Sequence, residues 1–164
     1  MFEAAVASYS LMTGIQVIYS WKFFRSHDSQ NSIDFISNPQ LQNNANNPTL
    51  NFFRTMLMNA FQHDEQYFKT FPTTEINDRN SNMKVIASLF KPSLGQKTQA
   101  IYAFAFFINE KYQTINTVIN DLVRDSAVEC AMLIQNALRK DEQLYTVTSK
   151  IHDCAYQISC IFRA

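Results

Sequence analysis

Residues 96–164 read QKTQA IYAFAFFINE KYQTINTVIN DLVRDSAVEC AMLIQNALRK DEQLYTVTSK IHDCAYQISC IFRA, and the stretch contains neither glycine nor proline. The whole chain of 164 residues has only two glycines, Gly14 and Gly95. Hairpins in β-sheets commonly use glycine where the backbone turns with positive φ. The sequence therefore predicts an all-α protein.

The apolar residues at the start of this stretch recur at alternating intervals of four and three residues. They are Ile101, Ala105, Ile108, Tyr112, Ile115, Ile119 and Leu122. Such spacing forms a heptad pattern, which is typical of a helix that packs along another helix. The pattern predicts one long helix that ends near Asp125.

Two further helices are expected before the end of the chain. Ser126 and Glu129 form a capping-box pattern, in which each side chain satisfies a free backbone amide at the start of a helix, and predict a helix over residues 126–140. A second three-four repeat predicts another helix over residues 141–161. Because short links between amphipathic helices favour antiparallel neighbours, residues 96–164 are expected to form three antiparallel helices.

The first part of the chain has a different composition. Apolar residues on several faces predict a first helix over residues 2–24. Residues 26–47 are rich in Asn, Gln and Ser, and this composition predicts a polar connection.

A second helix is predicted to start at Asn47-Pro48, because proline is favoured at the first position of a helix, and to reach about Lys69. A short apolar helix is expected around residues 85–90. Together the segments predict a single domain over residues 1–164, folded as a bundle of about five to six helices.

The charge of the chain is balanced. Lys plus Arg and Asp plus Glu each number 14, and the sequence contains no basic run. Nucleic-acid-binding proteins usually carry a basic excess or a basic stripe, so no nucleic-acid partner is expected. A net charge near zero gives little protection against association, which favours a protein partner or a homo-oligomer.

The three cysteines, Cys130, Cys154 and Cys160, are odd in number and lie on apolar faces of predicted helices. A disulfide framework usually has an even number of cysteines in a smaller chain. We therefore expect three reduced, packed thiols and a cytoplasmic protein.

Residues 2–24 leave three interpretations open: a core helix, a partner-facing helix or a membrane-associated helix. Trp21, Lys22 and Arg25 at the end of the segment resemble an interfacial anchor. Polar residues interrupt the apolar run, and Glu3 stands where a signal peptide carries positive charge. Membrane contact through this segment is thus an alternative to a core or interface role.

Each histidine of the chain precedes an aspartate, in the pairs His27-Asp28, His63-Asp64 and His152-Asp153. This pattern resembles the HD-domain metal-dependent phosphohydrolases, all-helical enzymes that bind metal through a His, a His-Asp pair and a distant Asp. The resemblance implies a divalent metal that activates water for attack on a phosphoester. Its ligands would be His27, His63, Asp64 and either Asp121 or Asp125.

Other signatures of enzymes are missing from the sequence, which has no glycine-rich phosphate loop, no Cys-x-x-Cys pair and no Glu-x-x-His motif. We therefore assign no catalytic residue and expect no cofactor. The favoured function is a non-enzymatic protein-interaction module, such as an adaptor, a chaperone-like protein or an inhibitor, that binds through an apolar helical surface. The alternatives are the HD-type phosphohydrolase and the membrane-associated helical protein.

Overall fold

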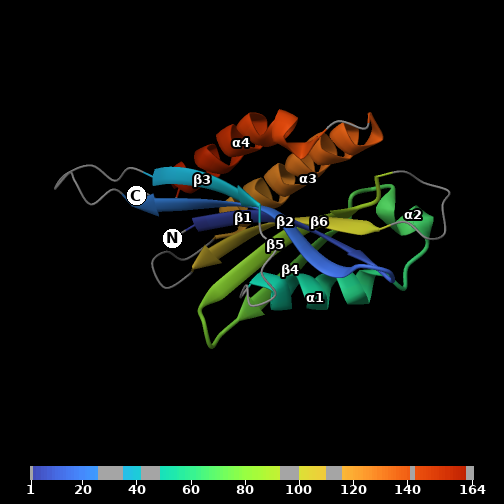
Figure 1. The fold of residues 1–164 in the computed structure, drawn as a ribbon. Helices are drawn as coiled ribbons and strands as arrows, with labels where there is room; N and C mark the ends of the chain where they lie inside the picture. Colours follow the sequence, from blue (N-terminus) through green and yellow to red (C-terminus); the bar gives the residue numbers. More distant parts are fainter. Residues whose placement is uncertain are drawn as a thin grey trace.

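The computed structural model describes residues 2–25, 35–41, 49–92, 100–109, 116–140 and 143–161. In these ranges the chain forms one antiparallel sheet of six strands, with one long helix on one face and two on the other (Figure 1). The fold is therefore mixed α/β, and the prediction of an all-α helical bundle is wrong.

The sheet has the strand order β3-β2-β1-β6-β5-β4, and every pairing is antiparallel. The strands are β1 (Phe2–Ser10), β2 (Gly14–Arg25), β3 (Phe35–Leu41), β4 (Thr73–Asp78), β5 (Met83–Phe90) and β6 (Ile101–Asn109). The middle of the sheet thus consists of β1, β6 and β5, while β3 and β4 lie at its two edges.

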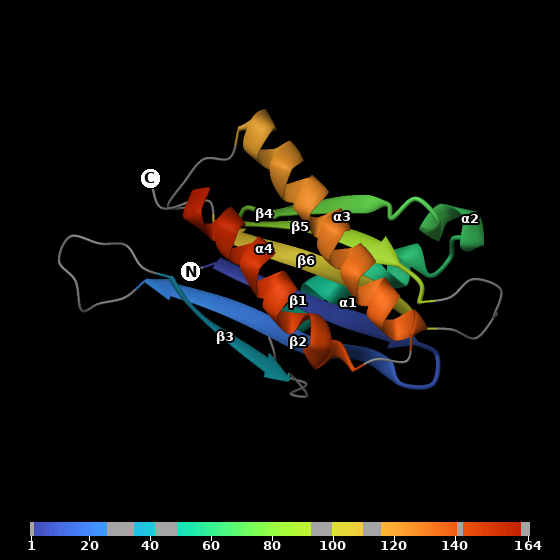
Figure 2. The ribbon, with the colours of Figure 1, turned by 90° about the horizontal axis from the view of Figure 1, so that it is seen from above.

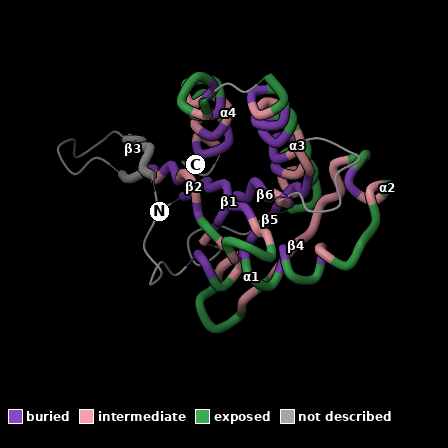
Figure 3. Tube along the Cα trace, turned by 45° about the vertical axis from the view of Figure 1, so that its right-hand side comes forward, coloured by how far each residue is buried: buried purple, intermediate pink, exposed green. Residues whose placement is uncertain are grey.

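The helices form two layers. They are α1 (Thr49–Ala60), the short α2 (Glu65–Phe68), α3 (Thr117–Arg139), the 3₁₀ turn η1 (Leu144–Val147) and α4 (Thr148–Ile161). Helices α3 and α4 lie side by side over one face of the sheet (Figure 2), and α1 covers the other. Buried residues line the sheet-facing sides of α3 and α4, while their outer sides are exposed (Figure 3).

Residues 2–24 form the hairpin of β1 and β2 and not a helix, so the predicted helical membrane anchor is also wrong. Phe2 lies opposite Phe23, and Ser10 lies opposite Gly14. Residues 2–8 are all buried, because helices cover both faces of β1. A strand buried on both faces has a nearly continuous apolar sequence, which periodicity does not separate from a buried helix. Within the described ranges, no helix combines the length and the hydropathy needed to cross a membrane.

Strand β6 replaces the first half of the helix predicted to end near Asp125. Phe104 and Phe106 face α3 and α4, whereas Ala103 and Ala105 face α1. This alternation is the two-residue period of a strand. The three-four spacing in this segment is therefore a coincidence within an apolar run. The short helix expected around residues 85–90 is also wrong, because these residues belong to strand β5 and are buried on both faces of the sheet.

The shortage of glycine did not exclude a sheet because the two tight hairpins in the described ranges use one glycine and one asparagine. Gly14, with φ of 68°, closes the turn from β1 to β2, where the Thr13 amide donates to Ser10 Oγ over 3.1 Å. Asn82, with φ of 53°, provides the left-handed residue between β4 and β5. Asparagine tolerates this conformation better than most residues.

Small side chains on the α1 face of the sheet let this helix approach closely. They are Ala5, Ala7, Ala87, Ala103 and Ala105. Phe53 and Leu57 of α1 are fully buried against this surface, and the ring of Phe53 lies 5.7 Å from that of Phe107, centroid to centroid. The apolar side of α1 is therefore used inside the fold and is not an exposed surface for a partner.

Helix α3 starts at Thr117, where Asn116 Oδ1 accepts the amide of Ile119 over 2.8 Å. It continues through Ser126, which is buried inside the helix, so the predicted break at that residue is wrong. The region predicted as the last helix, residues 141–161, contains η1 and α4. The expected three antiparallel helices are therefore two, α3 and α4.

The helix predicted to reach Lys69 ends earlier, because α1 stops at Ala60 and α2 begins only after Asp64. Most of the predicted polar connection, residues 26–34 and 42–47, lies outside the described residues. Its middle forms the edge strand β3.

We predict that replacing Gly14 by alanine lowers the free energy of unfolding by about 1 kcal/mol. A Cβ built at this position meets no atom within 4 Å, so the cost comes from the positive φ alone. Gly14→Asn should cost less, because asparagine tolerates this conformation. Urea denaturation of both variants checks the order, and equal losses would show that the turn does not depend on φ.

Candidate functional site

Among the described residues, strand β4 is paired with β5 alone. The amide of Leu89 donates to the carbonyl of Pro72 over 2.9 Å, and Thr73 lies opposite Ser88. In an antiparallel pair, hydrogen-bonded and non-bonded residue pairs alternate. The backbone groups of Thr73, Glu75 and Asn77 therefore point away from β5.

The ends of β4 are fixed by local structure. Phe71 has φ of 50°, a left-handed backbone conformation that turns the chain just before Pro72 and the start of β4. At the other end, Asp78 accepts hydrogen bonds from the amide of Asn80 over 3.1 Å and from Ser81 Oγ over 2.9 Å. These interactions limit the strand to a short segment and hold its turn.

On the α3 face of the sheet, Glu75 connects β4 to α3. Its Oε1 accepts hydrogen bonds from Asn120 Nδ2, over 2.8 Å, and from the guanidinium of Arg124. Lys84 Nζ of β5 lies 3.9 Å from Oε2 of the same carboxylate. Burial by itself raises the pKa of Glu75, but the hydrogen bonds from Asn120 and Arg124 and the charges of Lys84 and Arg124 hold it below its ordinary value.

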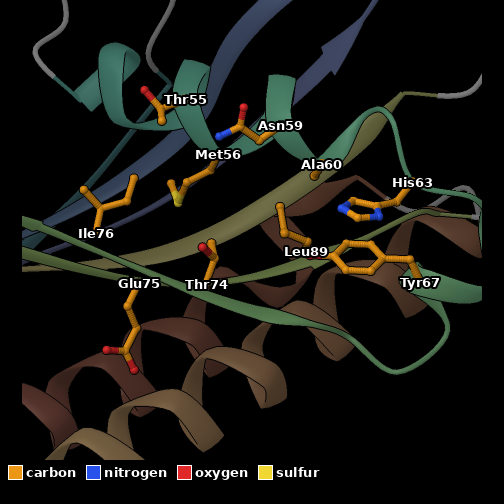
Figure 4. Close-up of a pocket in the computed structure, with 10 residues that line it drawn as sticks. All are labelled: Thr55, Met56, Asn59, Ala60, His63, Tyr67, Thr74, Glu75, Ile76 and Leu89. Atoms are coloured by element: carbon orange, nitrogen blue, oxygen red, sulfur yellow. The ribbon is translucent and has the colours of Figure 1, made fainter.

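On the α1 face, a cavity of about 220 Å³ lies between β4 and the second half of α1 (Figure 4). It is lined by Thr55, Met56, Asn59, Ala60, His63, Tyr67, Thr74, Glu75, Ile76 and Leu89. The side chain of Glu75 points away from this cavity, toward the helices on the other face. The lining combines apolar side chains with a few hydroxyl and amide groups, a composition common in ligand pockets.

One end of the cavity is a stack of two rings. The imidazole of His63 lies parallel to the phenol ring of Tyr67, with 3.9 Å between their centroids. Asp64 fixes this arrangement, because its Oδ1 accepts the amide of Tyr67 over 3.3 Å and caps α2. We call β4 (Thr73–Asp78), together with this cavity, the β4 edge site.

The residues of the proposed HD-type metal site are not brought together. His63 and Asp64 lie at the end of α1, on one side of the sheet, whereas Asp121 and Asp125 belong to α3 on the other side. His27 and Asp28 fall outside the described ranges. Among the residues that the structure describes, no three His, Cys, Asp or Glu side chains are grouped to hold a metal ion.

The remaining pair, His152-Asp153, lies on α4, with 3.2 Å between Nδ1 and Oδ1. Asp121 forms an ion pair with Arg124, with 3.5 Å between Asp121 Oδ1 and Arg124 Nη1. His152, Asp153 and Asp121 thus each have a neighbour within the same helix.

Strand β4 was missed, because the sequence predicted no element between the helix that reaches about Lys69 and the short helix around residues 85–90. A signal was present, because Thr73–Ile76 precedes a polar run rich in Asn and Asp, and an apolar run follows at residues 83–90. Two such runs joined by turn residues predict a hairpin. The strand was too short and too polar to compete with the helical interpretation of its neighbours.

Comparison with protein families identifies the chain. Residues 51–164, from α1 to the end, match the model of the C9orf72-like protein family. The chain belongs to the C9orf72-like protein family. No curated protein sequence matches this member of the family.

The fold of this C9orf72-like protein is similar to a solved structure described as the K. lactis Lst4 longin domain. The two agree with a TM-score of 0.56 over the full length of both chains, at 10% sequence identity. At this identity the likeness shows a longin-like α/β fold and nothing more specific. Family and fold together support the general part of the functional prediction, namely that the chain is a protein-interaction module with a protein partner.

We predict that Glu75→Gln weakens the contact between β4 and α3 and lowers the free energy of unfolding by about 1 kcal/mol. The side chain of Arg124 is 38% exposed, so solvent screens the pair and the loss stays small. Asp121→Asn, which removes a 61% exposed carboxylate from the same arginine, should cost less. Chemical denaturation at neutral pH measures both, and a larger loss for Asp121→Asn would contradict the assignment.

The same variant should show a defined pH dependence. The pKa of Glu75 is lower in the folded state than its ordinary value of 4.5, so its contribution is present above that value and is lost as the pH falls through the folded pKa. The stability difference between wild type and Glu75→Gln should therefore shrink in this acid range. A constant difference down to the folded pKa would show that the charge of Glu75 is not what stabilises the contact.

Proposed function

We propose that this protein is an interaction module that binds an extended segment of a partner protein along β4. The observation that carries the proposal is the outward direction of the backbone groups of Thr73, Glu75 and Asn77. An extended peptide that adds to a sheet edge gains main-chain hydrogen bonds from such groups. Membership of the C9orf72-like family and the longin-like fold support an interaction role.

The cavity beneath β4 supplies specificity in this proposal. Side chains of an added strand alternate between the two faces of the sheet, so every second one would lie on the α1 face beside Ile76 and Met56. A large apolar or aromatic side chain suits these residues and the His63–Tyr67 stack. The bound segment would thus be read by its shape in one pocket and by its backbone along the edge.

Among the three roles expected from the sequence, an adaptor, a chaperone-like protein and an inhibitor, this geometry favours an adaptor. A strand of six residues with one adjoining cavity can recognise a short, defined segment. A chaperone-like protein needs a larger apolar surface for unfolded chains. In the described ranges the exposed large apolar side chains are few and are divided among the turn after β1, α1, α3 and η1: Leu11, Met12, Met58, Val118, Leu122, Met132 and Tyr145.

A backbone substitution tests the edge. Peptides of about ten residues are first selected from a displayed random library on the wild-type protein, and their affinities are then measured on variants. Asn77→Pro removes an outward amide, and proline is tolerated on the free side of an edge strand. We predict that it weakens selected peptides about tenfold or more, because a hydrogen bond is lost and the ring obstructs the edge.

The matched control is Asn77→Ala, which removes the same side chain and keeps the amide. It should bind the peptides as the wild type does, and the thermal unfolding of both variants should be close to that of the wild type. Equal binding by Asn77→Pro and Asn77→Ala would contradict strand addition at β4. Failure of the library to yield any peptide that distinguishes the two would do the same.

A second substitution tests the cavity. Asn59→Trp places a large ring at its rim. We predict that this variant binds the selected peptides about tenfold more weakly than the wild type does. Met58→Trp is the control, because Met58 is an exposed neighbour on α1 that does not line the cavity. Unchanged binding by Asn59→Trp would show that the cavity does not read the peptide.

The β4 edge also offers a contact for the predicted homo-oligomer. Two copies of β4 can pair antiparallel with Ile76 of each copy opposite the other, which puts Glu75 opposite Asn77 and keeps both outward-pointing sets of backbone groups in contact. Light scattering tests this candidate. A dimer that Asn77→Pro dissociates would favour the second copy as the occupant, and a monomer at all concentrations would exclude it.

A further inference from the structure

Two cysteines meet where α3 packs against α4. Cys130 of α3 is fully buried in the core, and Cys154 of α4 is partly buried beside it. Cys154 Sγ lies 4.0 Å from the carbonyl oxygen of Ser126, one helical turn before Cys130. Cys154 therefore packs against the turn of α3 that leads to Cys130, and the two thiols lie in the same helix interface.

The two thiols differ in their readiness to ionise. The hydrogen bond to Cys154, followed by burial, raises the pKa of Cys130. The hydrogen bond from Cys130 lowers the pKa of Cys154. Cys154 is also the more accessible of the two. Because the thiolate is the form that reacts with oxidants, Cys154 is the residue that an oxidant meets first.

We propose that Cys130 and Cys154 are a modification site at which a hydroperoxide forms a reversible disulfide between α3 and α4. This site is separate from the β4 edge site, and its test does not depend on the proposed function. It also goes beyond the sequence prediction of three reduced, packed thiols.

The reaction is a two-step oxidation. The thiolate of Cys154 attacks one oxygen of hydrogen peroxide, the O–O bond breaks, and a sulfenic acid and hydroxide form; the hydroxide takes up the proton that Cys154 released. The Cys130 sulfur then attacks the sulfenic sulfur, the S–S bond forms, and the sulfenic oxygen leaves as water with the Cys130 proton. Two thiols lose two electrons in all, and one peroxide is reduced to two waters.

The placement of the residues favours this bond over others. A disulfide needs an S–S distance of about 2.05 Å, and the packing of Cys154 against the α3 turn before Cys130 places the two side chains in one interface. The bond would join two helices that are separate in sequence, so it constrains the unfolded chain and should raise the unfolding temperature. Cys160, partly buried on the same helix as Cys154, is the natural internal control.

The test treats the full chain with hydrogen peroxide, alkylates the remaining thiols and measures the intact mass before and after a reductant. We expect a monomer lighter by about 2 Da before alkylation, with one alkylatable thiol instead of three. The unfolding temperature should rise by several degrees and return to its original value after reduction. Peptide mapping should place the bond between Cys130 and Cys154.

Variants separate the roles of the three thiols. Cys160→Ser should leave the oxidation unchanged, whereas Cys154→Ser should abolish it. Cys130→Ala should stop the reaction at a sulfenic acid on Cys154, which a dimedone probe labels. If the buried Cys130→Ala variant does not fold, the comparison of Cys154→Ser with Cys160→Ser still decides.

Three results would overturn the proposal. They are a wild-type chain that keeps all three thiols under peroxide, a bond that maps to Cys160 or between two chains, and unchanged oxidation in Cys154→Ser.

Discussion

Burial of both faces of the central strands is the constraint on which the rest of this structure depends. Strands β1, β6 and β5 lie between α1 on one side and α3 with α4 on the other. Alanines on the α1 face, such as Ala103 and Ala105, bring that helix close, while Phe104 and Phe106 fill the opposite layer. This packing uses the sheet-facing apolar sides of all three long helices, and the outer edge of β4 is the surface on which the proposed function rests.

The β4 edge site follows from that arrangement. The contact of Glu75 with Arg124 and Asn120 holds β4 to α3, while the outward groups of Thr73 and Asn77 are left on the free side. A polar edge strand is less prone to uncontrolled pairing than an apolar one. The edge can therefore be kept available for a defined partner, and the cavity under α1 adds a place for a side chain.

The sequence predicted the helical part of the fold better than the sheet. Residues 141–161 contain the expected helical turns, and helix α3 was recognised although it was divided at Ser126. The strands were missed because β1 and β6 are apolar on both faces, so they lack the alternation that identifies a half-buried strand. The scarcity of glycine also favoured helices over strands, because the turn between β4 and β5 uses Asn82 in place of a glycine. A protein partner was expected from composition, but the site at β4 depends on strand order, which local patterns do not contain.

Amide hydrogen exchange along β4 tests the central claim most directly. We predict slow exchange for Thr74, Ile76 and Asp78, whose amides face β5, and fast exchange for Thr73, Glu75 and Asn77, whose amides face away. Two-dimensional NMR of the isolated protein resolves these residues. Equal protection of all six amides would mean that the edge is already paired, and fast exchange of all six would mean that β4 is not part of the sheet.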